Sequence, residues 1–304
     1  LLKSDKLTPL SEIAETQRID LEHLKFKAFN SFILNEASRA VKKNDIWIVN
    51  KIENDELIAK HINLGWKVKF PLKVLGRGLR RLSYVRTIDV TNTSDYLILS
   101  WFDGIKDLAR PLLNVKELEQ LNSNIINKWK NKFERGKCHV LFGRRFDISA
   151  VGTSLVSFYS ENPIVGTDHF WCIKGPVGDE AKILSLWMNS TINLLQLFTL
   201  RKETRGAWMQ IDSYVLSDCK MPKYSSLNRK EREKLIKTFE YIKNLNFPSI
   251  IEQLEKKHPL RRLIDEVWLQ VLDYKGDRKE LLDKLYDSLA HEIVTLKNMM
   301  REKA

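Results

Sequence analysis

The segment DEAKILSLWMNSTINLLQLFTL, residues 179–200, constrains the fold of this chain more than any other stretch. Drawn as a helix, it carries apolar side chains on most of its faces. Asp179 and Glu180 stand in its first turn and Arg201 and Lys202 follow its last residue, which is the arrangement that a helix dipole favours. A helix that is apolar on most sides is normally buried. The segment therefore predicts a largely buried helix in the protein core.

Helical spacing of apolar residues recurs elsewhere in the chain. A glycine at 136 marks the expected end of one such helix, and a glycine at 206 marks the break after the apolar segment. The last helix repeats apolar residues between Leu281 and Met300, which suits a stripe that packs on neighbouring helices or on a partner. The expected helices cover residues 24–40, 109–136, 228–246, 260–274 and the C-terminal stretch.

Alternating or short apolar runs indicate β-strands between these helices. The expected strands cover residues 45–52, 95–102, 139–148, 154–160 and 169–175. Strands interspersed with helices in this way predict an α+β fold. We expect residues 1–227 to form a mixed domain, and residues 228–304 to form a helical extension that packs back on it or pairs with another domain or subunit.

The chain is strongly basic, with a formal net charge of +12 and a pI near 9.4. The excess is concentrated in residues 57–88, which hold eight lysines and arginines and no acid. Basic and apolar residues alternate there, which predicts a strand or hairpin with one basic face. Such a face suits phosphate contacts with nucleic acid, although a solubilising surface is the alternative. The candidate contacts are Lys67, Lys69, Lys73, Arg77, Arg80, Arg81 and Arg86.

The same composition argues against several other classes of protein. Three cysteines without a CxxC pair suggest no disulfide framework, so we expect a reducing, cytoplasmic location. No apolar run approaches the ~20 residues that a membrane span needs, and no signal peptide is present. Because residue 1 is leucine rather than methionine, we expect the chain to be part of a longer protein.

A series of short motifs follows the apolar segment in a defined order. Asn189-Ser190-Thr191 is followed by Thr204-Arg205-Gly206, Gln210-Ile211 and Met221-Pro222, and a helix begins near Asn228. Together with FGRRFDISAVGTSLVSFYS (142–160), GLRRLSYVR (78–86) and PLSEIA (9–14), this order resembles the C-terminal target-recognition region of N6-adenine DNA methyltransferases of restriction–modification systems. It is also similar to the recognition domains of type I specificity subunits. The resemblance implies that the chain selects a site on double-stranded DNA.

The catalytic motifs of such a methyltransferase do not occur in the chain. The family binds S-adenosylmethionine with a glycine-rich loop and holds the target adenine with an (Asn/Asp/Ser)-Pro-Pro-aromatic motif. The nearest pieces here are Gly76-Arg77-Gly78 and Asn162-Pro163-Ile164-Val165, which predict turns. Whether the parent protein is an enzyme stays open. If it is, catalysis and S-adenosylmethionine belong to a catalytic domain outside this chain, attached in cis or as another subunit. A free-standing specificity subunit is the alternative.

Two further groups of residues are candidates for DNA contact. The loop after the apolar segment carries Arg201, Lys202, Arg205, Trp208 and Gln210. Arginine can pair with guanine and glutamine with adenine in the major groove, and tryptophan can pack on a sugar or a displaced base. Alternatively, the cations satisfy helix carbonyls and the tryptophan anchors the loop in the core. Arg144 and Arg145 beside Phe146 form the second group, with an exposed turn as the alternative.

Two patterns suggest metal chemistry, although no metal-binding residue is predicted. The first of them leaves a Mg²⁺-dependent DNA nuclease as an alternative function of a different class. Asp168 with Glu180 and Lys182 imitates the acid…Glu-x-Lys pattern of Mg²⁺-dependent DNA nucleases. Glu180 and Lys182 fall in the first turn of the expected helix, where the dipole explains the glutamate. Cys138-His139 with His169 and Cys172 is a conceivable zinc set, but its spacing matches no standard site.

Overall fold

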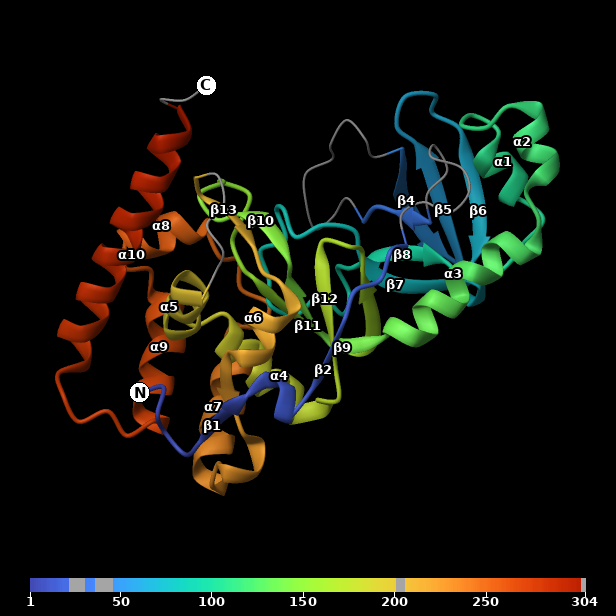
Figure 1. The fold of residues 1–304 in the computed structure, drawn as a ribbon. Coiled ribbons are helices and arrows are strands. Elements are labelled where there is room, and N and C mark those ends of the chain that lie inside the picture. The colour runs from blue at the N-terminus through green and yellow to red at the C-terminus, as the bar shows by residue number, and fades with distance from the viewer. Residues whose placement is uncertain (22–30, 36–45, 201–205, 302–304) are drawn as a thin grey trace.

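A computed structural model describes residues 1–21, 31–35, 46–200 and 206–301 of the chain (Figure 1). Helices and several sheets are mixed along it, so the α+β prediction is confirmed. The chain forms one extended molecule in which a sheet of three strands lies at one end, a seven-stranded sheet lies in the middle, and helices of the C-terminal part lie at the other end.

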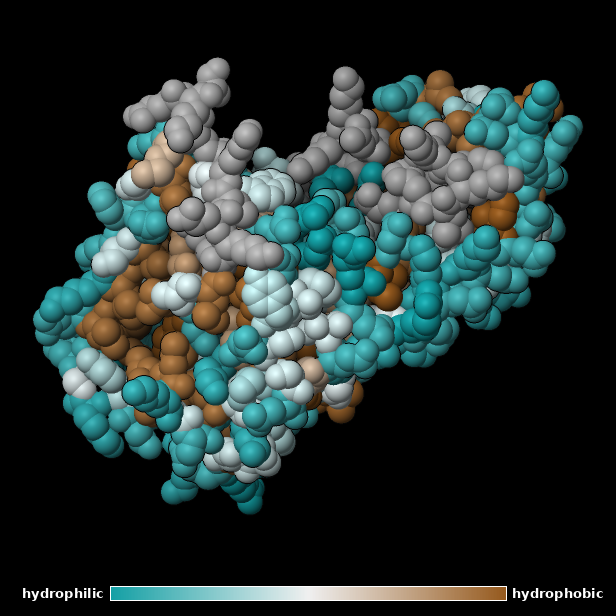
Figure 2. Space-filling model, viewed as in Figure 1, coloured by the Kyte–Doolittle hydropathy of each residue, from teal (hydrophilic) through white to brown (hydrophobic). Residues whose placement is uncertain are grey.

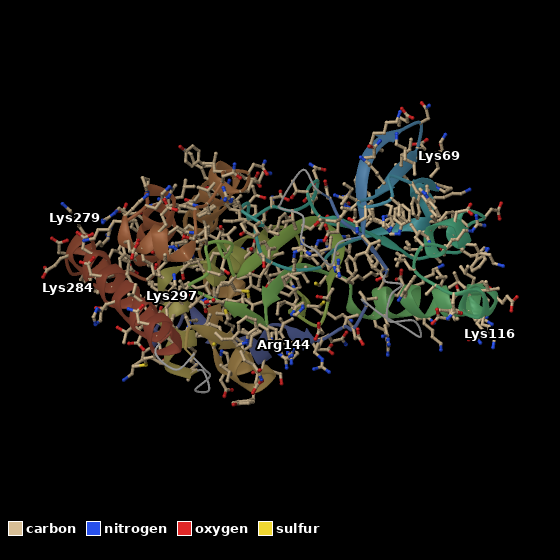
Figure 3. The ribbon with its side chains drawn as sticks, turned by 90° about the horizontal axis from the view of Figure 1, so that it is seen from above. Lys69, Lys116, Arg144, Lys279, Lys284 and Lys297 are labelled. Atoms are coloured by element: carbon tan, nitrogen blue, oxygen red, sulfur yellow. The ribbon has the colours of Figure 1, made fainter. Side chains whose placement is uncertain are left out.

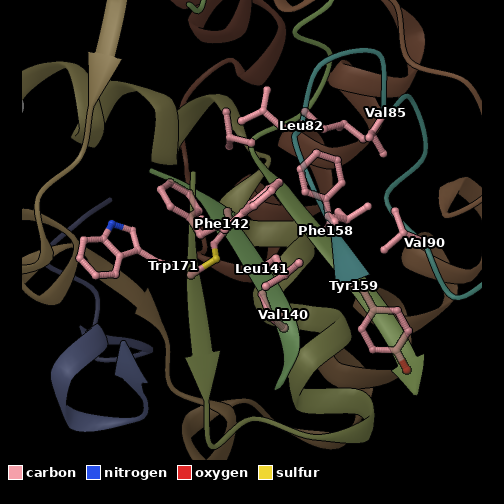
Figure 4. Close-up of a cluster of buried hydrophobic side chains, with 14 of the residues drawn as sticks. Leu82, Val85, Val90, Val140, Leu141, Phe142, Phe158, Tyr159 and Trp171 are labelled. Atoms are coloured by element: carbon pink, nitrogen blue, oxygen red, sulfur yellow. The ribbon is translucent and has the colours of Figure 1, made fainter. Parts of the chain in front are cut away.

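The seven-stranded sheet has the order β2-β12-β9-β11-β7-β8-β3. The pair β11–β7 is parallel and the other pairs are antiparallel. Side chains of β9 and β11 form much of the central core, and Leu82, Val85 and Val90 from the β7–β8 connection are buried against them (Figure 4). The strands are β2 (Glu15–Gln17), β3 (Phe32–Ile33), β7 (Leu75–Leu79), β8 (Asp95–Ile98), β9 (Cys138–Gly143), β11 (Ser157–Gly166) and β12 (Phe170–Lys174).

A separate three-stranded sheet consists of β4 (Trp47–Glu53), β5 (Glu56–His61) and β6 (Lys67–Pro71). In β6, exposed Lys67 and Lys69 alternate with buried Val68 and Phe70. The predicted alternation of this segment is therefore confirmed. The segment 57–88 is nevertheless not one ribbon, because β7 leaves this sheet and joins the seven-stranded one.

Two small ribbons and several helices complete the part of the chain up to residue 227. Pairing of β1 (Leu7–Pro9) with β14 (Lys220–Pro222) ties the N-terminal strand to a late one, and β10 (Arg145–Asp147) pairs with β13 (Trp208–Gln210). The helices here are α1 (Ile105–Ala109), α2 (Val115–Gln120), α3 (Ser123–Gly136), α4 (Gly178–Met188), α5 (Thr191–Leu200) and α6 (Ser213–Asp218). Single-turn 3₁₀ helices cover Leu10–Glu12, Leu72–Val74 and Tyr224–Ser226.

The apolar segment forms two helices where the sequence predicts one. The helices α4 and α5 are bent by 66° at Asn189 and Ser190. The Asn189 amide explains the break, because its Oδ1 accepts from the backbone of Val156 and Ser157 while its Nδ2 donates to the Ser157 carbonyl. The prediction of burial is confirmed for both helices.

Two other predictions of secondary structure are wrong. The expected helix 109–136 is interrupted twice, because Asn114 and Asn122 each accept backbone N–H groups as N-caps and start α2 and α3 anew. Gly136 lies inside the last turn of α3, where an added Cβ would stand 2.3 Å from the Cγ1 of Ile19. Of the expected helix 24–40, Phe32 and Ile33 instead form the edge strand β3, and most of the remainder lies outside the described residues.

Four helices form the described C-terminal part: α7 (Arg229–Ile242), α8 (Ile250–Glu255), α9 (Pro259–Val271) and α10 (Arg278–Arg301). The helices predicted over 228–246, 260–274 and the C-terminal stretch correspond to α7, α9 and α10, and α8 is not among the predicted helices. Asn228 caps α7 in a capping box with Glu231, and Pro259 opens α9. These helices pack on α4 and α5. Within the described ranges, no single helix is long and apolar enough to cross a membrane. The bent pair α4 and α5 meets that test jointly, and the second half of α4 is buried inside the protein.

Candidate nucleic-acid interface

The two-stranded ribbon of β10 and β13 brings three predicted contact residues to one face. Its register pairs Arg145 with Gln210 and Asp147 with Trp208, while Phe146 and Met209 between them are buried. Because side chains alternate across a strand, both outer pairs share the face opposite the core. Segments more than sixty positions apart in the chain thus build one polar and aromatic surface, which we call the ribbon face.

The side chains of the ribbon face differ in how firmly they are held. Trp208 is 44% exposed, so it does not anchor the loop in the core by full burial. The Gln210 amide donates to the Asp212 carboxylate over 3.2 Å. Arg145 is half-buried, and its Nε atom is buried without a hydrogen-bond partner among the residues that the structure describes. Arg201, Lys202 and Arg205, the other predicted contacts of this loop, lie outside the described residues.

Arg144 lies beneath the ribbon face rather than on it. Only 5% of the residue is exposed, its guanidinium donates to the Asp168 carbonyl over 2.8 Å, and it lies 5.7 Å from the centre of the Trp171 ring. Burial, followed by the charges of Arg145 and Arg18, lowers the pKa of Arg144. Arg144 therefore supports the ribbon from within and adds positive potential below it.

Arg18 is a residue that the sequence reasoning missed. It follows β2, whose strand pairs with β12 so that Gln17 stands opposite Cys172. Its charge acts on Arg144, so Arg18 is close to that buried cation. No local motif marks Arg18, because only the pairing of β2 with β12 brings it there.

The cations of β7 and the β7–β8 connection lie between the ribbon and the three-stranded sheet. The guanidinium of Arg77 donates to the Ser94 hydroxyl and the Thr91 carbonyl and stacks 4.1 Å over the Tyr96 ring. Burial lowers its pKa, so Arg77 is engaged in holding this connection in place. Arg80 and Arg81 are half-buried and Arg86 is exposed.

The backbone around Arg80 is fixed by buried polar groups. The Asp95 carboxylate, which is fully buried, accepts the Arg80 N–H over 2.9 Å, and the Thr167 hydroxyl donates to the Arg80 carbonyl. Leu82, Val85 and Val90 bury the apolar positions of the same connection (Figure 4). The connection is therefore held in place by buried groups, and its arginines differ in exposure, with Arg80 and Arg81 half-buried and Arg86 exposed.

The remaining predicted cations lie in the three-stranded sheet or directly after it. Lys67 and Lys69 are exposed on β6, Lys73 is exposed in the 3₁₀ helix that follows this strand, and Lys69 lies 3.5 Å from the Glu56 carboxylate. Seen from above, Lys69 lies toward one end of the molecule, Arg144 lies centrally, and Lys279 and Lys284 lie at the far end (Figure 3). Where the middle of the molecule is not drawn in grey, its visible face is mostly hydrophilic, whereas an apolar surface is visible over α5 and α10 (Figure 2).

The residues considered for metal chemistry have other surroundings. Lys182 pairs with Asp179 and with Glu240, and the carbonyl of Asp168 holds Arg144. Cys138 and Cys172 are buried, and the Nδ1 of His139 lies 3.0 Å from the Ser160 carbonyl oxygen. Within the described ranges, no group of three or more His, Cys, Asp and Glu side chains is arranged to hold a metal ion.

The sequence matches no known protein family and no curated protein. The fold is similar to that of BpuSI, a type IIG restriction endonuclease, with a TM-score of 0.62 at 13% sequence identity. The similarity covers 95% of this chain but 31% of the other, so this chain spans about a third of the length of that endonuclease. At this identity the likeness concerns the fold alone.

Proposed function

We propose that this chain binds double-stranded DNA and selects the site at which a restriction–modification enzyme acts. The observation that carries the proposal is the ribbon face, on which Arg145, Gln210 and Trp208 meet in a fold similar to part of a type IIG restriction endonuclease. The major groove of DNA admits a two-stranded ribbon. A ribbon with arginine and glutamine on its outer face carries the side chains that pair best with guanine and adenine.

The supporting cations fit the accompanying backbone contacts. Arg80 and Arg81, which are half-buried, and exposed Arg86 belong to the connection between β7 and β8, whose backbone is held by Asp95 and Thr167. Phosphate contacts fix the register of a protein on DNA, and contacts to base edges then provide the sequence preference. We therefore assign positioning to the arginines of the connection and reading of the bases to the ribbon face, with Trp208 packing on a sugar or an extruded base.

We further propose that the reaction belongs to a separate catalytic domain that transfers a methyl group from S-adenosylmethionine to the N6 of adenine. This assignment rests on the resemblance of the motifs between residues 139 and 226. Holding the duplex at a chosen site would let that domain extract the target base from the stack. A free-standing specificity subunit would contain the same recognition surface, and the ribbon face supports both forms equally.

Selection of bound duplexes from a random pool, followed by fluorescence anisotropy on the selected sequence, tests this proposal. We expect Arg145→Ala and Gln210→Ala each to cost about 1–3 kcal/mol on the selected duplex and to relax the preference at one base position. Lys279→Ala, far from the ribbon in Figure 3, serves as the matched charge control and should leave both quantities unchanged. A chain that binds all duplexes with equal affinity would refute the role in site selection.

A further inference from the structure

The three-stranded sheet has a cationic outer face of its own. The register of β4, β5 and β6 places Lys60 between Ile48 and Lys67, and Ile58 between Lys51 and Lys69. Leu57, Ala59, Val68 and Phe70 point the other way and are buried. One side of this sheet therefore belongs to the core. The other side carries four lysines around a buried Ile58, and of these Lys60 is half-buried and the other three are exposed.

The charges on this outer face are compensated at one end only. Lys51 lies 2.8 Å from Glu53 and Lys69 lies 3.5 Å from Glu56, near the tight turn between β4 and β5. Lys60 and Lys67 stand directly opposite each other across β5 and β6, toward the other turn. Neither of them has an acidic partner among the residues that the structure describes.

Like charges directly opposite each other destabilise a sheet. A solubilising surface avoids this cost by mixing both signs, as the Glu53 and Glu56 end of the same face does. The side chains of Leu64 and Trp66, in the turn beside Lys67, are also 51% and 46% exposed. The outer face of the sheet thus combines two cations that lack a described acidic partner with exposed apolar side chains. This combination suits a surface that binds an extended anion.

We propose that this outer face binds the phosphate backbone of double-stranded DNA outside the bases that the ribbon face reads. The inference rests on the proposed function. It adds Lys60 to the DNA contacts and assigns phosphate contacts to the sheet and base contacts to the ribbon face. The three-stranded sheet and the ribbon lie at separate places along the molecule (Figures 1 and 3), so the two contacts fall on different parts of one duplex. The sheet then adds affinity without sequence preference, and DNA flanking the recognised site strengthens binding.

The double variant Lys60→Ala/Lys67→Ala tests the proposal, with anisotropy measured on the selected duplex and on a scrambled one at several salt concentrations. Each phosphate contact contributes about 0.9 to the slope of log affinity against log salt. Loss of two contacts lowers the magnitude of the slope by about 1.8. The ratio of the affinity at 50 mM salt to that at 200 mM salt should therefore be about twelve times smaller for the variant than for the unmodified chain. We expect the same change on both duplexes and an unchanged base preference.

The matched control is Lys279→Ala/Lys284→Ala, which removes the same charge at the opposite end of the molecule (Figure 3). Its slope should equal that of the unmodified chain. The inference is overturned if the slope falls equally in the control. It is also overturned if Lys60→Ala/Lys67→Ala has an unchanged slope while the ribbon face still selects its site. Neither outcome contradicts the proposed function. Absence of any duplex binding by the unmodified chain overturns both the inference and the proposed function.

A single exposed substitution separates binding from folding. Lys67→Glu places opposite charges across the two strands, so its melting temperature should be no lower than that of the unmodified chain. Its affinity for both duplexes should fall further than that of Lys67→Ala. A lower melting temperature together with unchanged affinity would show that Lys67 serves the fold and not the ligand.

Discussion

At the scale of single residues, two buried charges join the break in the apolar segment to the C-terminal helices. Asp265 accepts the Thr191 N–H and hydroxyl and the Tyr286 hydroxyl, at 2.7, 2.6 and 2.7 Å. Arg261 donates to the Gln253 amide oxygen and to the Asn189 carbonyl. Burial raises the pKa of Asp265, and the nearby Arg261 opposes that rise. Every charge in this cluster is held by hydrogen bonds.

Removal of Asp265 should therefore be costly. Asp265→Ala leaves the Arg261 cation buried without its nearby counter-charge, and we expect a loss of about 3–5 kcal/mol in the free energy of unfolding. Tyr286→Phe deletes one bond to the same carboxylate and should cost about 1.5–3 kcal/mol. Urea denaturation of both variants measures these losses. Equal stabilities of Asp265→Ala and the unmodified protein would show that the cluster contributes nothing.

Gly136 gives a second prediction at the residue scale, because two effects oppose each other there. Alanine is favoured over glycine inside a helix by about 1 kcal/mol. The added Cβ would stand 2.3 and 2.8 Å from the Cγ1 and Cδ1 of Ile19, and overpacking typically costs about 1–3 kcal/mol. We expect Gly136→Ala to destabilise the protein in thermal melts. In the Ile19→Ala background, which removes both contacts, the same substitution should stabilise it.

At the scale of elements, an ion-pair cluster joins α4 to α7. The Glu240 carboxylate lies 2.8 Å from the Lys182 ammonium and 2.6 Å from that of Lys243. These two lysines lower the pKa of Glu240, and Glu240 raises the pKa of Lys182. Lys182, one residue of the pattern that imitates a nuclease motif, thus helps to hold two helices together.

The lowered pKa of Glu240 sets the sign of a pH effect. A carboxyl group whose pKa is lowered by folding stabilises the folded state at every pH above its pKa in the unfolded chain, which is about 4.3. This contribution is lost as the pH falls through the pKa of the folded state. Because the pair is partly exposed, Glu240→Gln should cost only about 0.5–1 kcal/mol at pH 6. The difference from the unmodified protein should shrink below about pH 4 in melting experiments. If the stability difference between Glu240→Gln and the unmodified protein grew as the pH fell, ionised Glu240 would not be the stabilising form.

At the scale of the whole molecule, the core is continuous across the boundary that the sequence suggests after residue 227. The rings of Tyr159 and Phe239 lie 5.2 Å apart, and those of Trp187 and Trp268 lie 4.9 Å apart, both edge to face. Each pair joins the part before the boundary to a helix after it. The C-terminal helices therefore cover the apolar segment, which would otherwise be exposed.

Separation of the two parts tests how far they depend on each other. A chain that ends at residue 227 exposes Tyr159 and Trp187, so we expect it to be insoluble or to bind hydrophobic dyes when expressed alone. Co-expression with residues 228–304 should restore a soluble complex that copurifies. A stable, cooperatively melting fragment 1–227 would instead establish two independent domains.

Local patterns were sufficient for much of the secondary structure. The alternation in residues 45–52 and the capping residue Asn228 predict elements that the structure contains, because strand alternation and helix capping depend on neighbours in the chain. The interruptions of 109–136 also follow from local features, the N-caps at Asn114 and Asn122. The prediction of one helix relied on the apolar spacing and did not consider these caps. The bend at Asn189 has a non-local cause, since its partners Val156 and Ser157 lie directly before and at the first residue of the distant strand β11.

The sequence by itself determined the types of side chain at the candidate site, the acid-free basic segment and the apolar character of 179–200, because these properties belong to residues and their immediate neighbours. Only the tertiary structure decided that Arg145 faces outward with Gln210, that Arg144 is buried, and that the basic segment divides between two sheets. Strand pairing and burial depend on contacts between distant parts of the chain, and each one-residue step along a strand turns a side chain to the opposite face.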